Sequence, residues 1–304
     1  MRGLAAFVLT VLISTPAVLP AVPTPVQVQM RNIALHVDAT TVINIVHLRG
    51  ELISTSPTRP PVFDDPQSFK VRVDSAAISL DAKALTQLLN RYTFAYKGSP
   101  LRDVDVTTED RGLKVSGELR KGISVPFSMT AEPSVAGGQL RLHPMKVKAL
   151  GIPTKRLMAL FGLELDNLIK LREDRGARID GDDFLLNPGA LLPPPTIEGR
   201  LQSVEVEGGR IVQRYGPGRL PALKPPDPSA ANYMYYSGGV LKFGKLTMTE
   251  TDMQLIDENP RDPFDFFQER YNEQLVAGYS KNTAALGLKV YMPDYHQVAA
   301  KRPR

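Results

Sequence analysis

The stretch VQVQMRNIALHV at 26–37 carries the clearest fold signal in the chain, because its apolar and polar residues alternate. Ile33, Leu35 and Val37 fall on one side of an extended chain, which is typical of a strand with one buried face. The next stretch, TVINIVHLRGELI at 41–53, alternates in the same way. We therefore expect half-buried strands here, followed by a loop over 55–67, where proline and acidic residues accumulate.

Further strands are expected downstream of this loop. SFKVRV at 68–73 begins one that continues to Leu80. Four more follow in close succession: LRDVDVT at 101–107, GLKVSGEL at 112–119, ISVPFSMTA at 123–131 and QLRLHPMKVKA at 139–149. Turn-like sequences at 109–112, 120–122 and 136–138 separate them, so the four strands are expected to form an antiparallel meander.

Two amphipathic helices are expected between the strands, which makes the fold class α+β. Asp81 is a suitable N-cap for the first helix, whose apolar stripe is Leu85, Leu88, Leu89 and Tyr92. The second helix begins near Pro153, and its apolar face contains Leu157, Leu160, Phe161, Leu165, Leu168 and Ile169. Shorter strands are expected at 177–180 and within TIEGRLQSVEVEGGRIV at 196–212.

The segment 214–230, RYGPGRLPALKPPDPSA, is the strongest candidate for a linker because proline and glycine dominate it. It divides a β-rich region, 22–213, from a smaller α+β region, 231–304. In the second region, YMYY at 233–236 and VLKFGKLTM at 240–248 are expected to be strands. Asp262-Pro263 is expected to open a helix that carries Phe264, Phe267, Tyr271 and Leu275.

The N-terminus resembles a secretory signal peptide over residues 1–21. A positive start, Met1-Arg2, precedes the apolar run LAAFVLTVLI at 4–13, and small residues and prolines follow at 14–21. The run is shorter than the roughly 20 residues that span a bilayer, so cleavage after Ala17 or Ala21 is expected. The mature chain is then exported, and the absence of cysteine favours a bacterial periplasm or cell envelope and excludes thiol chemistry.

Charge and composition narrow the class of partner. Of 304 residues, 42% are hydrophobic, which is enough for a sizeable core, and the net charge is +5. The charges are dispersed, and nucleic-acid binding needs a concentrated basic face, so no nucleic-acid partner is expected. A basic excess suits peripheral contact with anionic lipid headgroups, and it equally suits a solvated surface.

The order of elements between Ser75 and Val212 resembles that of the tubular lipid-binding (TULIP-like) superfamily, in particular its LmeA-like phospholipid-binding bacterial envelope proteins. The resemblance is carried by the strand-to-helix junction Ile78-Ser79-Leu80-Asp81 and by the closing segment Val204–Gly209, VEVEGG. It implies a curved antiparallel β-sheet wrapped against the two amphipathic helices, with acyl chains held in the crevice between them. Residues after Ala230 have no counterpart in it.

Candidate ligand-binding residues follow from this arrangement. A curved sheet whose inner face is apolar leaves a groove where the helices do not fill it, and each buried methylene group gains about 0.8 kcal/mol. The candidates are the apolar residues of the two helices: Leu85, Leu88, Leu89, Leu157, Leu160, Phe161, Leu165 and Leu168. The same stripes are also what ordinary packed core helices present.

Catalytic and metal-binding patterns are weak, so no enzyme, cofactor or metal is expected. The four histidines, His36, His47, His143 and His296, have no helical zinc-site spacing, although His36 and His47 lie on adjacent predicted strands. The sequence DGDD at 180–183 is expected to be an acidic turn. Asp262, Asp265 and Glu269 are expected to complement the start of a helix.

Three functions remain open at the level of sequence. The first is an exported, non-enzymatic protein that binds or transports a lipid or other apolar small molecule. The second is an envelope structural or assembly protein that binds a protein partner through the aromatic residues Tyr233, Tyr235, Tyr236, Phe243, Phe264, Phe266, Phe267 and Tyr271. Such residues suit a lipid mouth, a membrane edge or a protein interface, and they equally suit a core. A hydrolase without a motif is the third and weakest hypothesis.

Overall fold

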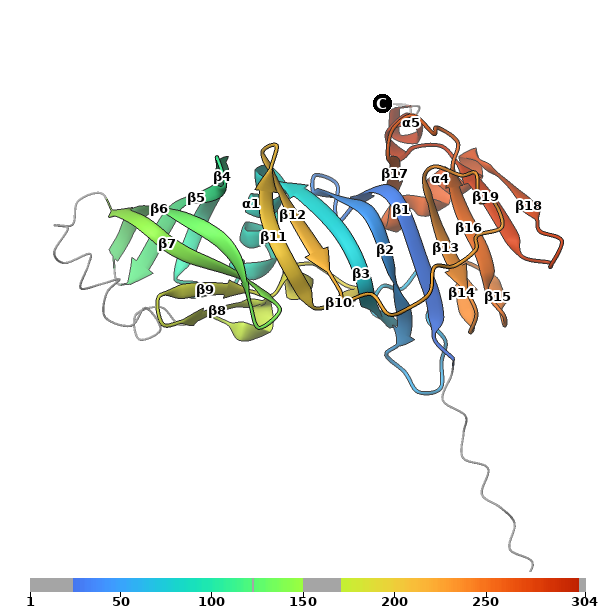
Figure 1. Cartoon of the computed structure of the whole chain (residues 1–304), viewed down its shortest axis with the longest axis horizontal. Helices are drawn as coiled ribbons and strands as arrows, with labels where there is room; N and C mark the ends of the chain where they lie inside the picture. The colour runs from blue at the N-terminus through green and yellow to red at the C-terminus, as the bar shows by residue number, and fades with distance from the viewer. Residues whose placement is uncertain (1–23, 122, 150–170, 301–304) are drawn as a thin grey trace, which may run out of the picture.

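Two β-sheets dominate the molecule. The computed structural model describes residues 24–121, 123–149 and 171–300, and they form a β-rich α+β structure, as the sequence predicts. An 11-stranded mixed sheet and a 6-stranded antiparallel sheet lie one after the other along the long axis (Figure 1). The larger sheet is mixed rather than wholly antiparallel, and neither sheet is curled or closed. The curled sheet that the TULIP-like resemblance implies is therefore not what the structure has.

The three longest neighbouring strands form the middle of the large sheet. Its order is β11 (Leu201–Glu207), β12 (Arg210–Tyr215), β3 (Phe69–Asp81), β2 (Val42–Ser54), β1 (Val26–His36), β13 (Tyr233–Ser237), β16 (Asp252–Asp257), β19 (Leu288–Met292) and β18 (Tyr279–Asn282). Two short strands pair in parallel beside these: β10 (Thr196–Glu198) with β3, and β17 (Phe264–Phe267) with β1. Strands β1, β2 and β3 therefore form a common platform for elements from both ends of the chain.

One face of this platform is apolar along its whole length because each central strand contains a bulge. Asn32 of β1 and Val46 of β2 interrupt the alternation at opposite positions, and Asn32 adopts a positive φ of 54°. In β3 the register shifts by one residue between Val73 and Ser75. Each bulge exchanges the faces to which odd- and even-numbered side chains point. Apolar residues before and after the bulge therefore reach the same face.

The small sheet confirms the predicted meander. Its order is β4 (Leu101–Glu109), β5 (Gly112–Lys121), β6 (Ile123–Ala136), β7 (Gln139–Ala149), β9 (Asp183–Leu186) and β8 (Ala177–Asp180). Helix α1 (Ala82–Leu88) begins where predicted, since the Asp81 carboxylate accepts a hydrogen bond from the Ala84 amide at 2.7 Å. It continues into a single π-helical turn, Leu89–Thr93, which includes Tyr92. The predicted second helix lies outside the described residues.

The C-terminal region differs from the prediction at one helix. Residues 264–267 form strand β17, and the helix α4 (Tyr271–Ala277) begins only at Tyr271. Phe264 and Phe266 are buried when this segment pairs with β1, which outweighs the helix-start signal of Asp262-Pro263. The stretch 240–248 forms two strands, β14 (Leu241–Phe243) and β15 (Leu246–Met248), and α5 (Tyr295–Ala300) follows β19.

The predicted linker crosses the polar face of the large sheet, and we call residues 216–230 the strap (Figure 1). The Asp74 carboxylate accepts the amides of Arg219 and Leu220 at 2.7 and 2.9 Å. Farther along, the Gln29 side chain bonds both the amide and the carbonyl of Leu223. Because β13 pairs with β1, the regions before and after the strap contribute strands to one sheet.

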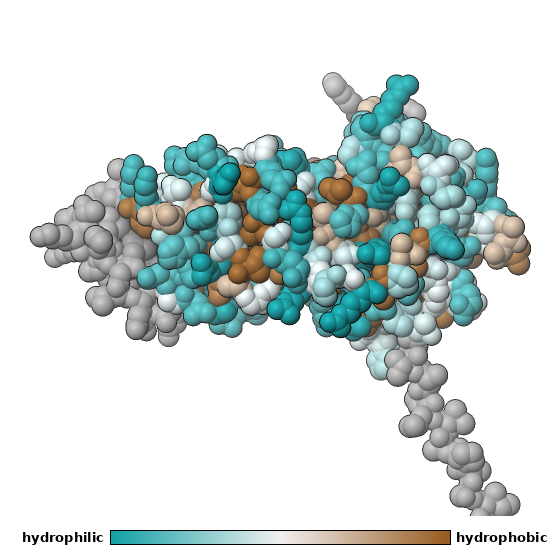
Figure 2. Space-filling model, in the orientation of Figure 1, coloured by the Kyte–Doolittle hydropathy of each residue, from teal (hydrophilic) through white to brown (hydrophobic). Residues whose placement is uncertain are grey.

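The opposite, apolar face of the sheet is covered by two separate hydrophobic cores. One lies under α1 and the small sheet and includes Leu85, Leu113 and Leu140. The other lies under β14, β17 and α4 and includes Phe63 and Phe266. Charged residues are dispersed over the outer surface, where several separate apolar areas lie among hydrophilic residues on the face in Figure 2. Within the described ranges, no helix is both long and apolar enough to cross a bilayer.

Candidate binding groove

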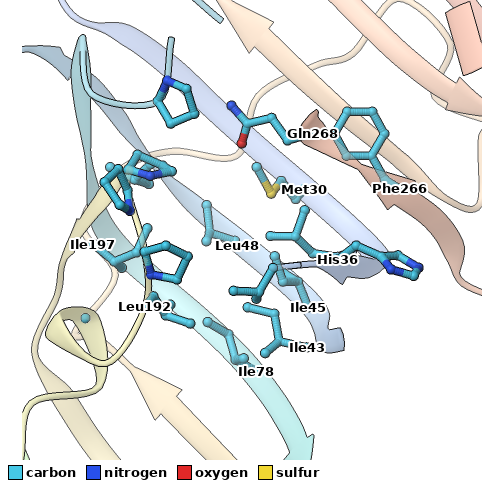
Figure 3. Close-up of a pocket in the computed structure, with 18 of the residues that line it drawn as sticks. Met30, His36, Ile43, Ile45, Leu48, Ile78, Leu192, Ile197, Phe266 and Gln268 are labelled. Atoms are coloured by element: carbon cyan, nitrogen blue, oxygen red, sulfur yellow. The ribbon is translucent and has the colours of Figure 1, made fainter. Parts of the chain in front are cut away.

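An apolar groove lies on the central platform where the two cores meet. Its cavity volume is about 370 Å³ (Figure 3). Leu35, Ile78 and Tyr215 pack against both cores, which locates the groove at their junction. The floor consists of apolar side chains from three strands and from Val37, which directly follows β1: Met30 and Leu35 of β1, Ile43, Ile45, Leu48 and Leu52 of β2, and Phe69, Val71, Ile78 and Leu80 of β3. This volume falls within the range of small-molecule sites.

One wall is the proline-rich segment Pro188–Ile197, which includes Leu192 and Pro193-Pro194-Pro195. Its end is fixed because β10 pairs with β3 along Thr196–Glu198. Its start is fixed by Gly189, whose backbone lies so close to Ile197 that an added Cβ would be 1.9 Å from the Ile197 carbonyl oxygen. In Figure 3, Leu192 and Ile197 lie on the opposite side of the groove from Phe266.

The second wall comes from the loop before β3 and from the end of β17. It includes Phe63, Pro66, Phe266 and Gln268. The Gln268 amide donates to the Phe63 carbonyl oxygen at 3.0 Å, which joins the two segments. Leu191 of the first wall belongs to the core under the small sheet, whereas Phe63 and Phe266 of the second wall belong to the other core, against which Ile197 also packs. The groove lies above β1–β3 between these two walls.

Polar groups are few in the groove. At its β12 end, the Tyr215 hydroxyl donates to Gln213 Oε1 at 2.7 Å. Burial raises the pKa of the Tyr215 hydroxyl well above its usual value, so it stays protonated as a donor. At the mouth, Asp65 and Glu269 are exposed carboxylates, and no lysine or arginine lies among the described lining residues.

Only some of the ligand-binding residues predicted from the sequence line the groove. Leu85 and Leu88 line the groove. Leu89 faces the neighbouring core, where it borders a void of about 30 Å³ beneath the small sheet, and Leu85 borders this void too. The other candidates lie outside the described residues: Leu157, Leu160, Phe161, Leu165 and Leu168.

Most of the groove residues were not among the sequence-based candidates. The floor of the groove comes from strands β1–β3. The sequence predicts these strands as half-buried but does not assign their buried face to a ligand. The triple proline 193–195 signals only a loop in the sequence. The pairing of β10 with β3 brings it to the groove, and this long-range parallel contact has no local signature.

The aromatic residues of the C-terminal region are core residues. All eight named above are buried, and the Phe63 ring lies 5.1 Å from those of both Phe243 and Tyr271 between centroids. Of this set, Tyr236 and Phe266 also reach the groove. Five of the eight belong to the second core: Tyr236, Phe243, Phe264, Phe266 and Tyr271. The eight residues therefore do not form an exposed aromatic surface in the described structure.

The histidines and acidic residues make structural contacts. Asp265 lies in β17 and its carboxylate bonds both His36 and His296, at 2.5 and 2.7 Å, so its predicted role at a helix start is wrong. His36 and His47 do not face each other, because His36 pairs with Val42 and His47 with Arg31.

In the acidic turn at 180–183, the Asp183 carboxylate forms a hydrogen bond with His143 Nδ1 at 2.7 Å. Within the described ranges, no group of three or more histidine, aspartate or glutamate side chains has the arrangement of a metal site.

Comparison with known proteins assigns no family to this chain. No profile of a known protein family matches it, no curated protein matches it, and no solved structure matches its fold. The groove and its residues are therefore the basis for assigning a function.

Proposed function

We propose that this protein is an exported, non-enzymatic binding or transport protein for a lipid or other apolar small molecule in the bacterial cell envelope. The observation that carries the proposal is the open apolar groove where two hydrophobic cores meet. A folded protein buries apolar side chains by packing them against each other. Here eleven floor side chains lie beneath a space that neither core occupies, which is the geometry of a site for an apolar guest.

The energy available in such a groove is sufficient for binding. A volume of about 370 Å³ holds roughly 12 methylene groups, if each takes about the 30 Å³ of a water molecule. At about 0.8 kcal/mol per methylene group, their transfer from water contributes roughly 10 kcal/mol before the loss of translational and conformational freedom. No covalent chemistry is needed to retain such a ligand.

The proposed location in the cell envelope and the proposed lipid-binding class are supported by the sequence. The signal-like residues 1–21 support export, and the order of elements between Ser75 and Val212 supports a lipid-binding class. Because the sheets are not curled, the groove and not the TULIP-like resemblance is the main support. Peripheral contact with a membrane belongs to the same proposal, because a guest of this kind is delivered from a lipid surface.

The first test is a tryptophan reporter in the proline-rich wall. The chain has no tryptophan, so Leu192→Trp introduces a single indole beside the groove. Adding a long-chain lipid to the delipidated variant should shift the emission to shorter wavelength and saturate near one equivalent. The matched control is Leu246→Trp, a 47% exposed position on β15 outside the groove, whose emission should not change. Equal responses at both positions, or none at Leu192, would count against the proposal.

A protein-binding role is the alternative, and the structure offers less for it. The aromatic residues that motivated it are buried. A pull-down with the full chain that recovers one stoichiometric protein partner, combined with a protein free of extractable lipid, would favour the alternative over the groove.

A further inference from the structure

The polar groups of the groove narrow the class of ligand. We infer that the groove takes a single-chain, uncharged lipid whose polar end is a hydrogen-bond acceptor such as an alcohol, ester or ketone oxygen. This inference rests on the proposed function and specifies its ligand. It follows from three observations: the size of the groove, an amide inside it, and the charges at its mouth.

The size of the groove fits one hydrocarbon chain. Its volume of about 370 Å³ corresponds to roughly 12 carbon atoms at about 30 Å³ each. The lining residues extend from β12 across β3, β2 and β1 to β13, which is four inter-strand spacings. At about 4.8 Å for each spacing, the groove is about 19 Å long. A long, narrow space of this volume accommodates one extended chain, whereas the two chains of a diacyl phospholipid need about twice the volume.

Gln213 supplies a hydrogen-bond donor at the β12 end. Its side chain is on the apolar face of the sheet, in register with Ile78 of β3 and Val204 of β11, and it is only 6% exposed. Tyr215 donates to its Oε1 atom, so the amide nitrogen is left as the free end. Among the described residues, Gln213 Nε2 has no hydrogen-bond partner, and it is not one of the fully buried unpartnered atoms, so it remains accessible from the groove.

An accessible amide N–H at the end of an apolar groove can donate to a ligand oxygen in place of water. Gln213 lines the groove, so a ligand oxygen is the partner that its position allows. The acceptor is held at the inner end of the chain, and the hydrocarbon then lies over Ile78, Ile45 and Leu48 toward the second core.

The mouth of the groove disfavours an anionic ligand. Asp65 and Glu269 are both exposed at the lining, and neither forms an ion pair within the described ranges. The lining has no described lysine or arginine to offset them. A fatty-acid carboxylate would therefore meet two like charges on entry and no lysine or arginine among the described lining residues.

The test compares three lipids on the delipidated full chain: 1-dodecanol, dodecanoate and dimyristoyl phosphatidylcholine. Isothermal titration should give one site for 1-dodecanol, and binding of the other two that is weaker by about tenfold or more. If dodecanoate or the phospholipid binds as tightly as 1-dodecanol, the inference is overturned and the apolar groove function remains. If none of the three binds, the proposed function itself is overturned.

Two variants isolate the amide. Gln213→Leu keeps the approximate size of the side chain and should weaken 1-dodecanol binding roughly three- to tenfold, because it removes one hydrogen bond. Gln202→Leu, at an exposed glutamine of β11 outside the groove, is the matched control and should bind as the wild type does. Tyr215→Phe keeps Gln213 and removes the hydroxyl that orients it, so it should give a smaller loss in the same direction. Unchanged binding in both Gln213→Leu and Tyr215→Phe would overturn the role of the amide.

A third variant isolates the charge. Glu269→Lys places a cation at the mouth and should improve dodecanoate binding about tenfold while 1-dodecanol binding stays within about twofold. If dodecanoate affinity does not respond, the carboxylates do not select the ligand.

Discussion

At the scale of single residues, Gly189 determines how closely the proline-rich wall approaches the sheet. The backbone of Ile197 occupies the place where any side chain at position 189 would begin, and a backbone carbonyl does not move aside as a flexible side chain does. The distance between the start of this wall at Gly189 and its end at Ile197 is therefore fixed by the absence of a Cβ, and the shape of the groove depends on it.

Gly189→Ala should destabilise the fold by about 1 to 3 kcal/mol, the usual cost of overpacking, and should weaken lipid binding by displacing the wall. Urea unfolding and the lipid titration measure the two effects. Gly216→Ala is the control, because the nearest atom to its added Cβ is 3.4 Å away. A Gly189→Ala protein with wild-type stability and binding would show that the wall tolerates a side chain there.

Asp257 is a second residue whose environment has a measurable consequence. Burial raises its pKa from 3.8 to about 6, and the neighbouring carboxylates Asp294 and Asp262 act in the same direction. Because the folded-state pKa is above the unfolded value, the folded protein binds this proton more tightly. The stability that the proton confers is present below about pH 4 and is lost as the pH rises to about 6.

Asp257→Asn should remove this dependence. Relative to the wild type, the variant should gain roughly 1 to 3 kcal/mol in unfolding free energy between pH 4 and pH 6, since one pKa unit corresponds to about 1.4 kcal/mol. The substituted side chain keeps a carbonyl oxygen to accept from Asn232, which donates to the Asp257 carboxylate at 2.9 Å. Chemical denaturation at several pH values measures the difference, with the exposed Asp182→Asn as control. Parallel pH profiles for wild type and Asp257→Asn would contradict the assignment.

At the scale of elements, the backbone of the strap is bonded by side chains of the sheet. These hydrogen bonds take the place of those that a neighbouring strand would supply. The amides of Gln29 and Gln254 each bond the amide and the carbonyl of one strap residue, Leu223 and Asp227 respectively. Arg49 also donates to the Leu220 carbonyl oxygen at 2.8 Å. A proline-rich segment cannot form a regular ladder, because proline lacks the N–H donor, so discrete side-chain contacts fix it instead.

Asp74→Ala should loosen the first third of the strap, because two backbone amides lose their acceptor. We expect a loss of about 1 to 3 kcal/mol in unfolding free energy and faster amide hydrogen exchange at Arg219 and Leu220. Asp182→Ala, in an exposed turn, should change neither. Unchanged exchange at both amides in Asp74→Ala would mean that the strap is held elsewhere.

The elements also show where local pattern has limits. The segment 262–275 satisfies a helix spacing at Phe264, Phe267 and Tyr271, and it equally satisfies a strand spacing at Phe264 and Phe266. The strand is formed because both phenylalanines are then buried beside β1, and this partner is more than 200 residues away in sequence. By contrast, the meander of β4–β7 was predictable, because each strand pairs with its neighbour across a short turn.

At the scale of the whole molecule, the β-rich α+β class follows from the alternating sequence, whereas the continuous apolar face of the central strands depends on the irregularities that interrupt this alternation. The groove does not, since it arises from the positions of two covering layers that the sequence joins only through long-range pairings. Leu85 and Leu88 were accessible to prediction because helical spacing marked them as one stripe. Gln213 was not, because an isolated glutamine in an alternating strand has no local mark of function.

The central claim is that one apolar guest occupies the space above β1–β3, and native mass spectrometry of the full chain tests it most directly. Leu48 lies on the floor of the groove, so Leu48→Trp fills the space, while Leu246→Trp adds the same group outside it. We expect one equivalent of lipid on the wild type and on Leu246→Trp after incubation with 1-dodecanol, and binding at least about tenfold weaker on Leu48→Trp. Equal occupancy of all three proteins, or no adduct on any of them, would contradict the account.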